Sequence, residues 1–364
     1  MNVNKTILIA PLDWGLGHAT RCIPLIQLLI QKNHRVIIAG NGDSFYLLKV
    51  TFPLLNFYEL PGYNITYANG KNAAFYALLQ TPKILKTIQE ENKVIATIVE
   101  NEKIDLIISD NRYGVRHTSI KSIFICHQIA LQAPNAFKFA NSLFLKLHLQ
   151  QIHKFNALWI PDEATENNLS GKLSHHISFK IPTTYIGIQS RFSNFKKSDS
   201  FIDDIEIDIL IVLSGPEPQR SYIENELKRK LQCINKKVVL IQGKTAAQTI
   251  TTEDNITTIS YLNTNDLFCA LQKATAIICR SGYSTVMDLA VLGKEAVLIP
   301  ASGQTEQEYL AQTLANKGFA VECLQDKLDI ENALLQLESI KGFPVYTTST
   351  KIIEQELESI FTPK

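Results

Sequence analysis

The chain of 364 residues contains no apolar run long enough to cross a membrane and no pair of closely spaced cysteines. A membrane-spanning helix needs roughly 18 or more apolar residues. The N-terminal apolar run from Thr6 to Leu12 is too short for the core of a signal peptide and is followed directly by Asp13. Because no C-x-x-C pair is present, we expect buried free thiols in a cytoplasmic protein rather than disulfides or zinc ligands. The cysteines are Cys22, Cys126, Cys233, Cys269, Cys279 and Cys323.

Neither sign of charge is in excess, because 36 Lys and Arg residues face 35 Asp and Glu residues. The chain therefore has no overall basic field to attract nucleic acid. A hydrophobic content of 45% and a charged content of 20% are those of a globular protein, and the length suffices for two domains. No D-x-D metal site is recognisable, because Glu206 and Asp208 lie inside a predicted strand. We expect no metal and no cofactor.

The stretch 277–307 has the pattern of a βαβ unit. A short apolar strand ends at Cys279, a tight turn follows at 280–282, and a helix continues to Gly293. A second apolar strand covers 295–299 and is followed by a polar loop. The loops after the carboxyl ends of parallel strands meet at one edge of a sheet, where ligands of open α/β sheets bind. Both polar loops should therefore lie at the same edge of the sheet.

The chemistry of this stretch fits a nucleotide sugar. The helix that begins near Tyr283 presents unpaired N–H groups and the positive end of its dipole, which suit a diphosphate. Asp288, about two turns into that helix, is an acceptor for ribose hydroxyls. The alternative is a capped helix with solvated polar loops. The predicted donor-binding residues here are Arg280, Ser281, Gly282, Thr285, Asp288, Gln304, Glu306 and Gln307.

A glycine-rich loop follows the first predicted strand. Gly15 and Gly17 let the backbone turn sharply and approach a ligand closely. His18, at the start of the next helix, is placed to act as a general base or to donate to an oxyanion, and Arg21 offers a fixed charge one turn on. The alternative for His18 is a capping or packing role.

Two further strands end in polar residues. The strand 104–109 is followed by Asp110, and the strand 121–126 by His127. Both residues should reach the edge that holds His18, as candidates for acceptor binding or acid–base work. Carboxylates at strand ends also cap helices, so Asp110 has a structural alternative.

These motifs carry a resemblance. The run R-S-G, the acidic Asp288, a strand, a proline and the loop Q-x-E-Q resemble the donor half of GT-B glycosyltransferases. The most similar family is that of the peptidoglycan lipid-intermediate N-acetylglucosaminyltransferase, of the glycosyltransferase family 28 C-terminal-domain type, although Asp288 stands where that family usually has Glu. The pattern G-x-G-H-x-x-R around His18 resembles the first loop of the same enzymes. It also resembles the loop of a nucleotide-sugar hydrolase in the pseudaminic acid pathway.

The resemblance implies an α/β GT-B fold, with two Rossmann-like domains facing a central cleft. We expect an N-terminal acceptor domain at 1–190, a polar linker at 191–204 and a UDP-sugar-binding domain at 205–348. The terminal helix at 349–364 should pack back on the first domain. The segment 214–220 stands at a second glycine-rich loop of the resembling enzymes but lacks their glycines.

Two details of the donor domain follow from that departure and from the resemblance. Arg220 is either a substitute positive charge for the diphosphate or a solvated side chain. The backbone near Tyr261 and Leu262 would meet the uracil ring.

The activity implied is that of an inverting, metal-independent glycosyltransferase. Its donor would be a UDP-sugar, with UDP-N-acetylglucosamine as the first candidate, and His18 or Asp110 would be the base. The acceptor would be a glycan or glycolipid of cell envelope biosynthesis, with peripheral contact at the inner face of the cytoplasmic membrane as one option. Alternatives are a nucleotide-sugar hydrolase, an epimerase and a non-catalytic nucleotide-sugar-binding protein.

Three segments carry structural expectations of their own. Residues 47–71 are predicted as strand and loop. Residues 73–100 are predicted as helix, broken near Pro82, with an amphipathic face that packs on the core or rests on a membrane surface. Residues 136–155 are apolar, aromatic and basic, and form either a buried helix or a segment that covers the acceptor cleft or touches lipid.

Overall fold

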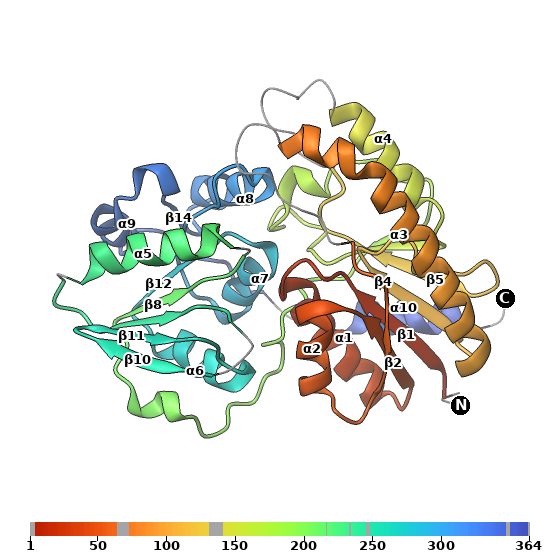
Figure 1. Ribbon diagram of the computed structural model, residues 1–364, viewed down its shortest axis with the longest axis horizontal. Coiled ribbons are helices and arrows are strands. Elements are labelled where there is room, and N and C mark those ends of the chain that lie inside the picture. Colours follow the sequence, from red (N-terminus) through yellow and green to blue (C-terminus); the bar gives the residue numbers. More distant parts are fainter. Residues whose placement is uncertain are drawn as a thin grey trace. The chain divides into compact units, whose positions relative to one another are not determined.

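The computed structural model describes residues 4–63, 73–130, 141–215, 217–232, 234–244, 248–346 and 350–362. The chain divides into two compact units (Figure 1). The first contains Met1–Ser190 together with Thr348–Lys364, and the second contains Arg191–Thr347. Each unit has its own seven-stranded sheet.

The sheet of the first unit is parallel throughout, in the order β3-β2-β1-β4-β5-β6-β7. The strand order reverses direction between β1 and β4, so the carboxyl ends of these two strands form the switch point at which α/β sheets bind ligands. The strands are β1 (Thr6–Pro11), β2 (Arg35–Gly40), β3 (Asn56–Glu59), β4 (Leu106–Asp110), β5 (Lys121–Ile125), β6 (Ala157–Ile160) and β7 (Thr183–Tyr185).

Helices cover both faces of this sheet, which explains why its central strands are apolar along their whole length. Figure 1 shows α3 in front of the strands and α10 behind them. Ile95 and Ile98 of α3 pack on Leu8 and Ala10 of β1. The helices are α1 (Gly17–Gln31), α2 (Gly42–Thr51), α3 (Ala73–Glu102), α4 (Asn141–Ile152) and α10 (Lys351–Phe361).

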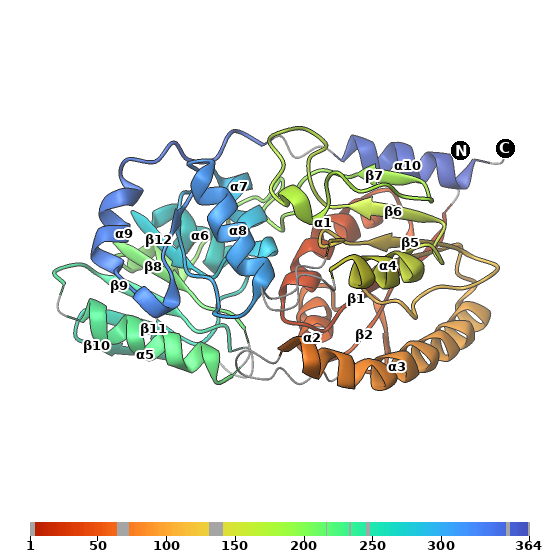
Figure 2. The ribbon, with the colours of Figure 1, turned by 90° about the horizontal axis from the view of Figure 1, so that it is seen from above.

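The last helix belongs to the first unit although it follows the second in sequence (Figure 2). It buries Ile353 and Leu357. Glu354 forms an ion pair with Lys32 at the end of α1, with Nζ and Oε2 2.6 Å apart. Lys121 at the start of β5 donates to the carbonyl of Ile360 at 2.8 Å. α10 thus ties together elements from both halves of the first sheet.

The sheet of the second unit has the order β10-β11-β9-β8-β12-β13-β14. All neighbouring pairs are parallel except β10 and β11, an antiparallel hairpin that the sequence pattern did not predict. The switch point lies between β8 and β12. The strands are β8 (Ile209–Val212), β9 (Val238–Ile241), β10 (Ile250–Glu253), β11 (Ile256–Ile259), β12 (Ala276–Cys279), β13 (Val297–Leu298) and β14 (Val321–Glu322).

The helices of the second unit pack on a continuous apolar core. In this core, Ile223 and Leu227 of α5 cluster with Ile211 of β8 and Leu240 of β9. The helices are α5 (Gln219–Leu231), α6 (Thr264–Lys273), α7 (Tyr283–Leu292), α8 (Thr305–Asn316) and α9 (Ile330–Leu337).

Two expected elements are wrong in part. Residues 47–51, expected as strand or loop, belong to α2, where Leu47 and Leu48 are buried while Val50 is 61% exposed. The helix after residue 73 is not broken at Pro82 but runs on to Glu102. A proline removes only one N–H from the helix, and the burial of later residues such as Ile95 sustains it. Residues 64–71 and 136–140 of the expected segments lie outside the described residues.

The polar segment 191–204 is ordered against the second unit. Phe192 and Phe195 pack on Phe268 of α6, with ring centroids 5.7 Å and 5.1 Å away. The Ser200 hydroxyl donates to Asp266 at 2.6 Å. The polar composition of 191–204 suggested a free linker, but the side chains of Phe192 and Phe195 anchor the segment.

Within the described ranges, no helix is sufficiently long and apolar to traverse a bilayer.

Candidate functional site

The switch point of the first unit gathers the polar residues that follow β1 and β4. Pro11 at the end of β1 pairs with Asp110 at the end of β4, and the Leu12 N–H donates to the Asp110 carbonyl at 3.0 Å. From there the chain turns at Gly15, whose φ of 74° is in the left-handed region that favours glycine. The turn leads directly into α1, so His18 on its first turn lies beside the end of β4.

Asp110 is the centre of this cluster and is fully buried. Its Oδ1 lies 2.8 Å from Nδ1 of His18, and its Oδ2 accepts from Nε of Arg21 at 2.5 Å. A second Arg21 nitrogen donates to Oδ1, so the guanidinium holds the carboxylate with two hydrogen bonds. Arg21 also reaches Nδ1 of His127 at 2.9 Å. The four residues His18, Arg21, Asp110 and His127 therefore form one connected cluster.

The charges of the cluster determine the protonation state of His18. Burial alone would raise the pKa of Asp110, but the positive charge of Arg21 and the hydrogen bonds from Arg21 and His18 lower it, so the carboxylate is ionised at neutral pH. Burial, and then the positive charge of Arg21, lower the pKa of His18. The imidazole is therefore neutral at pH 7.

The proton of this neutral imidazole is assigned to Nδ1. An ionised oxygen 2.8 Å from Nδ1 requires a proton between the two atoms, because otherwise two lone pairs would face each other. Nδ1 also lies 2.8 Å from an Arg21 nitrogen, but the carboxylate is the acceptor that both groups share. Nε2 then carries a lone pair, and the His18 side chain is 13% exposed. A base of this form can take a proton from a bound hydroxyl.

In the second unit, the turn after β12 opens into α7 as the pattern predicts. β12 ends at Cys279, α7 begins at Tyr283, and Gly293 closes it in the left-handed conformation. Gly282 is the N-cap residue and supplies no side-chain cap, and a Cβ placed on it would meet no described atom within 4 Å. The Cα of Gly282 thus borders open space in the described structure, and half-buried Thr285 lies in the first turn of α7.

The loop after β13 is hydrogen-bonded to this turn. The Ser281 hydroxyl donates to the Gln307 carbonyl at 2.8 Å, and the Gln307 side chain accepts from the Ala301 N–H at 3.0 Å. Gln307 also donates to the Gln304 side chain at 2.6 Å. Glu306 lies in the first turn of α8, where a negative charge complements the helix dipole. The structure therefore brings Ser281, Gln304 and Gln307 together.

Asp288 has a partner that the sequence did not suggest. Its Oδ2 accepts from Nε of Arg191 at 3.1 Å, and the Asp288 side chain is only 7% exposed. Arg191 was assigned to a linker, and no local pattern links it to a helix almost a hundred positions later. Asp288, the expected acceptor for ribose hydroxyls, is therefore paired with Arg191 at the start of the second unit.

The two arginines expected near a diphosphate are both engaged within the second unit. Arg280 is 2% exposed, donates to the Ile299 carbonyl at 3.2 Å and to Gln325 at 2.8 Å, and burial lowers its pKa to about 10. Arg220 forms an ion pair with Glu217 at 2.6 Å. Leu262, expected near the uracil ring, is 2% exposed.

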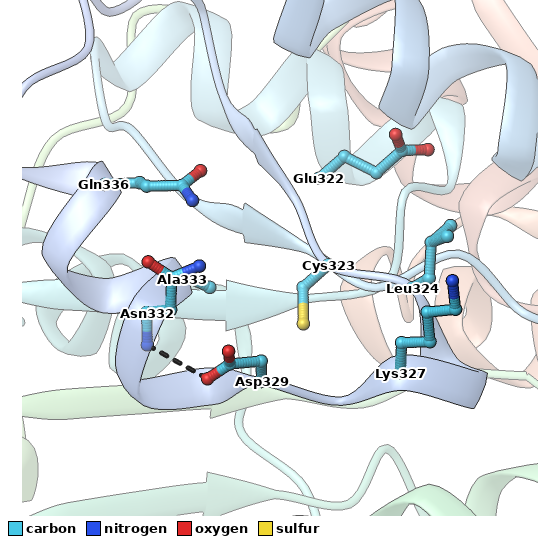
Figure 3. Close-up of a pocket in the computed structure, with 8 residues that line it drawn as sticks. All are labelled: Glu322, Cys323, Leu324, Lys327, Asp329, Asn332, Ala333 and Gln336. Carbon is cyan, nitrogen blue, oxygen red and sulfur yellow. Dashed lines mark hydrogen bonds between the residues drawn. The ribbon is translucent and has the colours of Figure 1, made fainter.

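A pocket of about 180 Å³ lies elsewhere, between the end of β14 and α9 (Figure 3). Asp329 accepts from the Asn332 N–H at 3.2 Å there and so caps α9. None of the expected site residues lines this pocket. Its lining is Glu322, Cys323, Leu324, Lys327, Asp329, Asn332, Ala333 and Gln336. In the described parts of the chain, no three His, Cys, Asp or Glu side chains gather as a metal site would require.

Comparisons with known proteins show what the chain is similar to. Residues 210–360 match the model of the glycosyltransferase family 28 C-terminal domain. The chain is 23% identical, over 93% of its length and 90% of the relative, to the UDP-N-acetylglucosamine--N-acetylmuramyl-(pentapeptide) pyrophosphoryl-undecaprenol N-acetylglucosamine transferase of Haemophilus ducreyi. It is 35% identical over 80 residues, 21% of this chain and 22% of the relative, to the protein of the same name from Alkaliphilus oremlandii. The crystal structure of the glycotransferase of kitacinnamycin aligns with this chain with a TM-score of 0.66 at 13% identity. The alignment covers 100% of each chain.

Fold and comparisons together define this protein as a glycosyltransferase of the GT-B fold. Residues 210–360 resemble the glycosyltransferase family 28 C-terminal domain, and 93% of the chain aligns at 23% identity with an N-acetylglucosamine transferase.

Proposed function

We propose that the protein is an inverting glycosyltransferase that moves a sugar from a UDP-sugar, of which UDP-N-acetylglucosamine is the first candidate, to a hydroxyl of a glycan or glycolipid. The observation that carries this proposal is the contact of 2.8 Å between Nδ1 of His18 and the buried carboxylate of Asp110. The names of the relatives, which specify UDP-N-acetylglucosamine and an undecaprenol-linked acceptor, support the choice of substrates. A lipid-linked acceptor would bring the protein to the inner face of the cytoplasmic membrane.

In the proposed reaction, Nε2 of His18 takes the proton of the acceptor hydroxyl. The hydroxyl oxygen forms a bond to the anomeric carbon while the bond from that carbon to the UDP oxygen breaks on the opposite side, which inverts the configuration. Asp110 fixes the imidazole through Nδ1 and stabilises the imidazolium that forms. Arg21, with two hydrogen bonds to Asp110, keeps that carboxylate ionised and oriented.

On the donor side, the diphosphate would lie at the N-terminus of α7, where the N–H groups and the helix dipole stabilise the charge that develops on UDP. The ribose hydroxyls would bind Asp288. Gln304, Glu306 and Gln307 would bind hydroxyls of the sugar. The open space at Gly282 and the hydrogen bond between Ser281 and the Gln307 carbonyl support this placement. The charge on UDP needs no metal ion in this scheme.

The decisive experiment measures UDP release from a panel of UDP-sugars, with and without a lipid and glycan extract as the acceptor source, in the presence of a chelator. Release that depends on the extract and survives chelation is the expected result. Rapid release in buffer alone would identify a nucleotide-sugar hydrolase instead. A failure to bind any UDP-sugar would overturn the donor site itself.

Asp288→Ala should weaken UDP binding by about 10- to 150-fold, because a hydrogen bond to a charged group contributes about 1.5–3 kcal/mol. Asp288→Glu should retain most of the affinity, since it keeps the acceptor chemistry. Arg191→Ala removes the ion pair but not the carboxylate, so it should leave UDP binding at least as tight. Calorimetric titration with UDP measures all three, and equal losses in Asp288→Ala and Arg191→Ala would show that only the ion pair matters.

The pH dependence of transfer should report His18. Its pKa is lowered from the usual value of about 6.5, and only the neutral form accepts a proton, so kcat/KM should rise with pH along an acid limb whose midpoint lies below that usual value. Arg21 lowers the pKa of His18 and Asp110 raises it. Arg21→Gln should therefore move the acid limb to higher pH, and Asp110→Asn should move it to lower pH. Movement in the same direction would contradict the assignment.

A further inference from the structure

The connection between β6 and β7 is long and has little regular secondary structure. The strands β5, β6 and β7 lie next to one another at one side of the first sheet (Figure 2). Residues 161–182, which join β6 to β7, are all described, and the only helix among them is the 3₁₀ turn Gly171–Leu173. A loop of this length without its own secondary structure is uncommon in a compact domain, and an ordered one is usually functional.

A single buried carboxylate orders this loop. The Asp162 side chain is fully buried, and its Oδ1 accepts from the N–H groups of Glu163 and Leu169, each at 2.8 Å. Its Oδ2 accepts from the Ser170 N–H at 2.9 Å and from the Ser170 hydroxyl, and Nε2 of His175 lies 3.2 Å away. Burial alone would raise the pKa of Asp162, but the hydrogen bonds from His175, Leu169 and Ser170 lower it. The group that holds the loop is therefore an ionised acceptor.

The end of the loop is fixed against β7. The His175 ring stacks on the ring of Tyr185, with centroids 4.7 Å apart and planes at 23°. The Tyr185 hydroxyl donates to the Ser174 carbonyl at 3.0 Å. The stretch 169–175 is thus held by the carboxylate after β6 on one side and by the last strand of the sheet on the other.

This stretch in turn holds the segment that carries His127. The Leu173 carbonyl accepts from the N–H groups of Ile129 and Ala130, both at 2.8 Å. On the other side of His127, the Cys126 N–H donates to a carbonyl of β6 at 3.1 Å. The backbone around His127 is therefore anchored both before and after the histidine.

The position of His127 matters because it provides a second acceptor for Arg21. Nδ1 of His127 lies 2.9 Å from a terminal nitrogen of Arg21. A guanidinium only donates, so Nδ1 of His127 accepts, and the ring proton is assigned to Nε2. His18 has the opposite arrangement, with its proton on the Nδ1 that faces Asp110. Arg21 thus spans two acceptors, Asp110 and His127, and a shift of His127 would release one side of the guanidinium.

We infer that Asp162 is a positioning residue: by ordering the stretch 169–175, it holds the segment after β5 so that Nδ1 of His127 accepts from Arg21. The inference rests on the proposed transferase function and assigns the loop between β6 and β7 a part in it. Asp162 acts through His127 and Arg21 on the carboxylate that orients His18.

The first test follows the ring nitrogens of His127 and needs no substrate. In protein with ¹⁵N-labelled histidines, the His127 resonances are those that disappear in His127→Ala, and in the wild type they should report a proton on Nε2. Asp162→Asn places an amide NH₂ where a carboxylate oxygen accepted hydrogen bonds, so the loop should loosen and His127 should exchange between its two tautomers. Unchanged His127 resonances in the folded Asp162→Asn variant would overturn the inference.

The second test asks whether Asp162 acts through His127. Asp162→Asn should lower the single-turnover rate of transfer by about 10- to 100-fold with UDP affinity unchanged, because a displacement of about 1 Å can cost about a hundredfold. In the His127→Ala background the same change should alter the rate by less than about twofold, since the contact that it supports is already lost. His148→Ala leaves both bonds to the Leu173 carbonyl in place and should not reproduce the loss. Losses of Asp162→Asn and His127→Ala that multiply would show that Asp162 does not act through His127.

Two further variants complete the design. His175→Phe keeps an aromatic ring and removes one hydrogen bond from Asp162, so it should give a smaller loss of rate that also vanishes in the His127→Ala background. Asp105→Asn is the matched control, because Asp105 accepts from the Thr6 N–H at 2.8 Å at the opposite edge of the same sheet, and its rate should equal that of the wild type. A wild type that transfers no sugar but shows the expected His127 resonances would overturn the proposed function and not the positioning of His127.

Discussion

His18→Ala is expected to lower the rate of transfer by about 10²- to 10⁴-fold, the range that a positioned general base contributes. The affinity for UDP should stay within a factor of about two, because the expected donor residues lie in the second unit. The physical reason is the loss of Nε2, the lone pair that takes the proton from the acceptor hydroxyl. Single-turnover rates and UDP titrations on the same variant measure the two quantities separately.

The control for this prediction is His148→Ala. His148 is buried in the same unit, and its Nδ1 lies 3.0 Å from the Ile129 carbonyl, but it belongs to α4 and not to the Asp110 cluster. Its loss should lower stability more than the turnover of the folded protein. If His18→Ala kept wild-type turnover, or lost UDP binding in parallel with turnover, the division of roles between the two units would be wrong.

Much of the fold could be predicted because strand and turn signals are local. The apolar run before Asp13 and the R-S-G turn after Cys279 each mark a strand that feeds a helix, and the structure has β1 with α1 and β12 with α7 there. Where tertiary packing decides, the prediction failed. Residues 47–51 became helix because Leu47 and Leu48 are buried, and Pro82 did not interrupt α3.

The candidate site could be predicted in its residue types and only partly in its contacts. The strand that ends at Asp110 and the helix whose first turn holds His18 meet because β1 and β4 are neighbours, which the switch-point rule anticipates. The pairing of Arg191 with Asp288 could not be predicted, since it joins residues 97 positions apart without a local signal. The same is true of Glu91 and Arg112, whose pairing depends on how α3 lies on the sheet.

Glu91 and Arg112 form an ion pair with both side chains fully buried. Nε of Arg112 donates to Glu91 at 2.6 Å, and the other guanidinium nitrogens donate to Asn41 at 2.9 Å and to the Pro61 carbonyl at 2.7 Å. Glu91 also accepts from the Tyr63 hydroxyl and from the Gly114 N–H at 3.1 Å. The pair thus connects α3, the end of β4 and the loops that follow β2 and β3.

Arg112→Ala is expected to lower the free energy of unfolding by about 3–5 kcal/mol, because it leaves a buried carboxylate without its cation. Lys86→Ala is the control on the same helix. The Lys86–Glu90 pair is 3.7 Å long with side chains that are 77% and 46% exposed, and exposed pairs contribute about 0–1 kcal/mol. Denaturant titrations of the two variants should therefore differ by several kcal/mol.

The pH dependence of this loss identifies its cause. Burial raises the pKa of Glu91, and Arg112 opposes that rise, so the Arg112→Ala variant should raise the pKa of Glu91 further. A carboxyl group whose pKa is higher in the folded state destabilises the fold as pH rises through that range. The difference in stability from the wild type should then be smaller at pH 5 than at pH 8. A pH-independent difference would assign the loss to packing rather than to an unpaired charge. The double variant Arg112→Met with Glu91→Leu removes both charges. It should recover part of the stability if the unpaired charge is the cause, and none if packing is the cause.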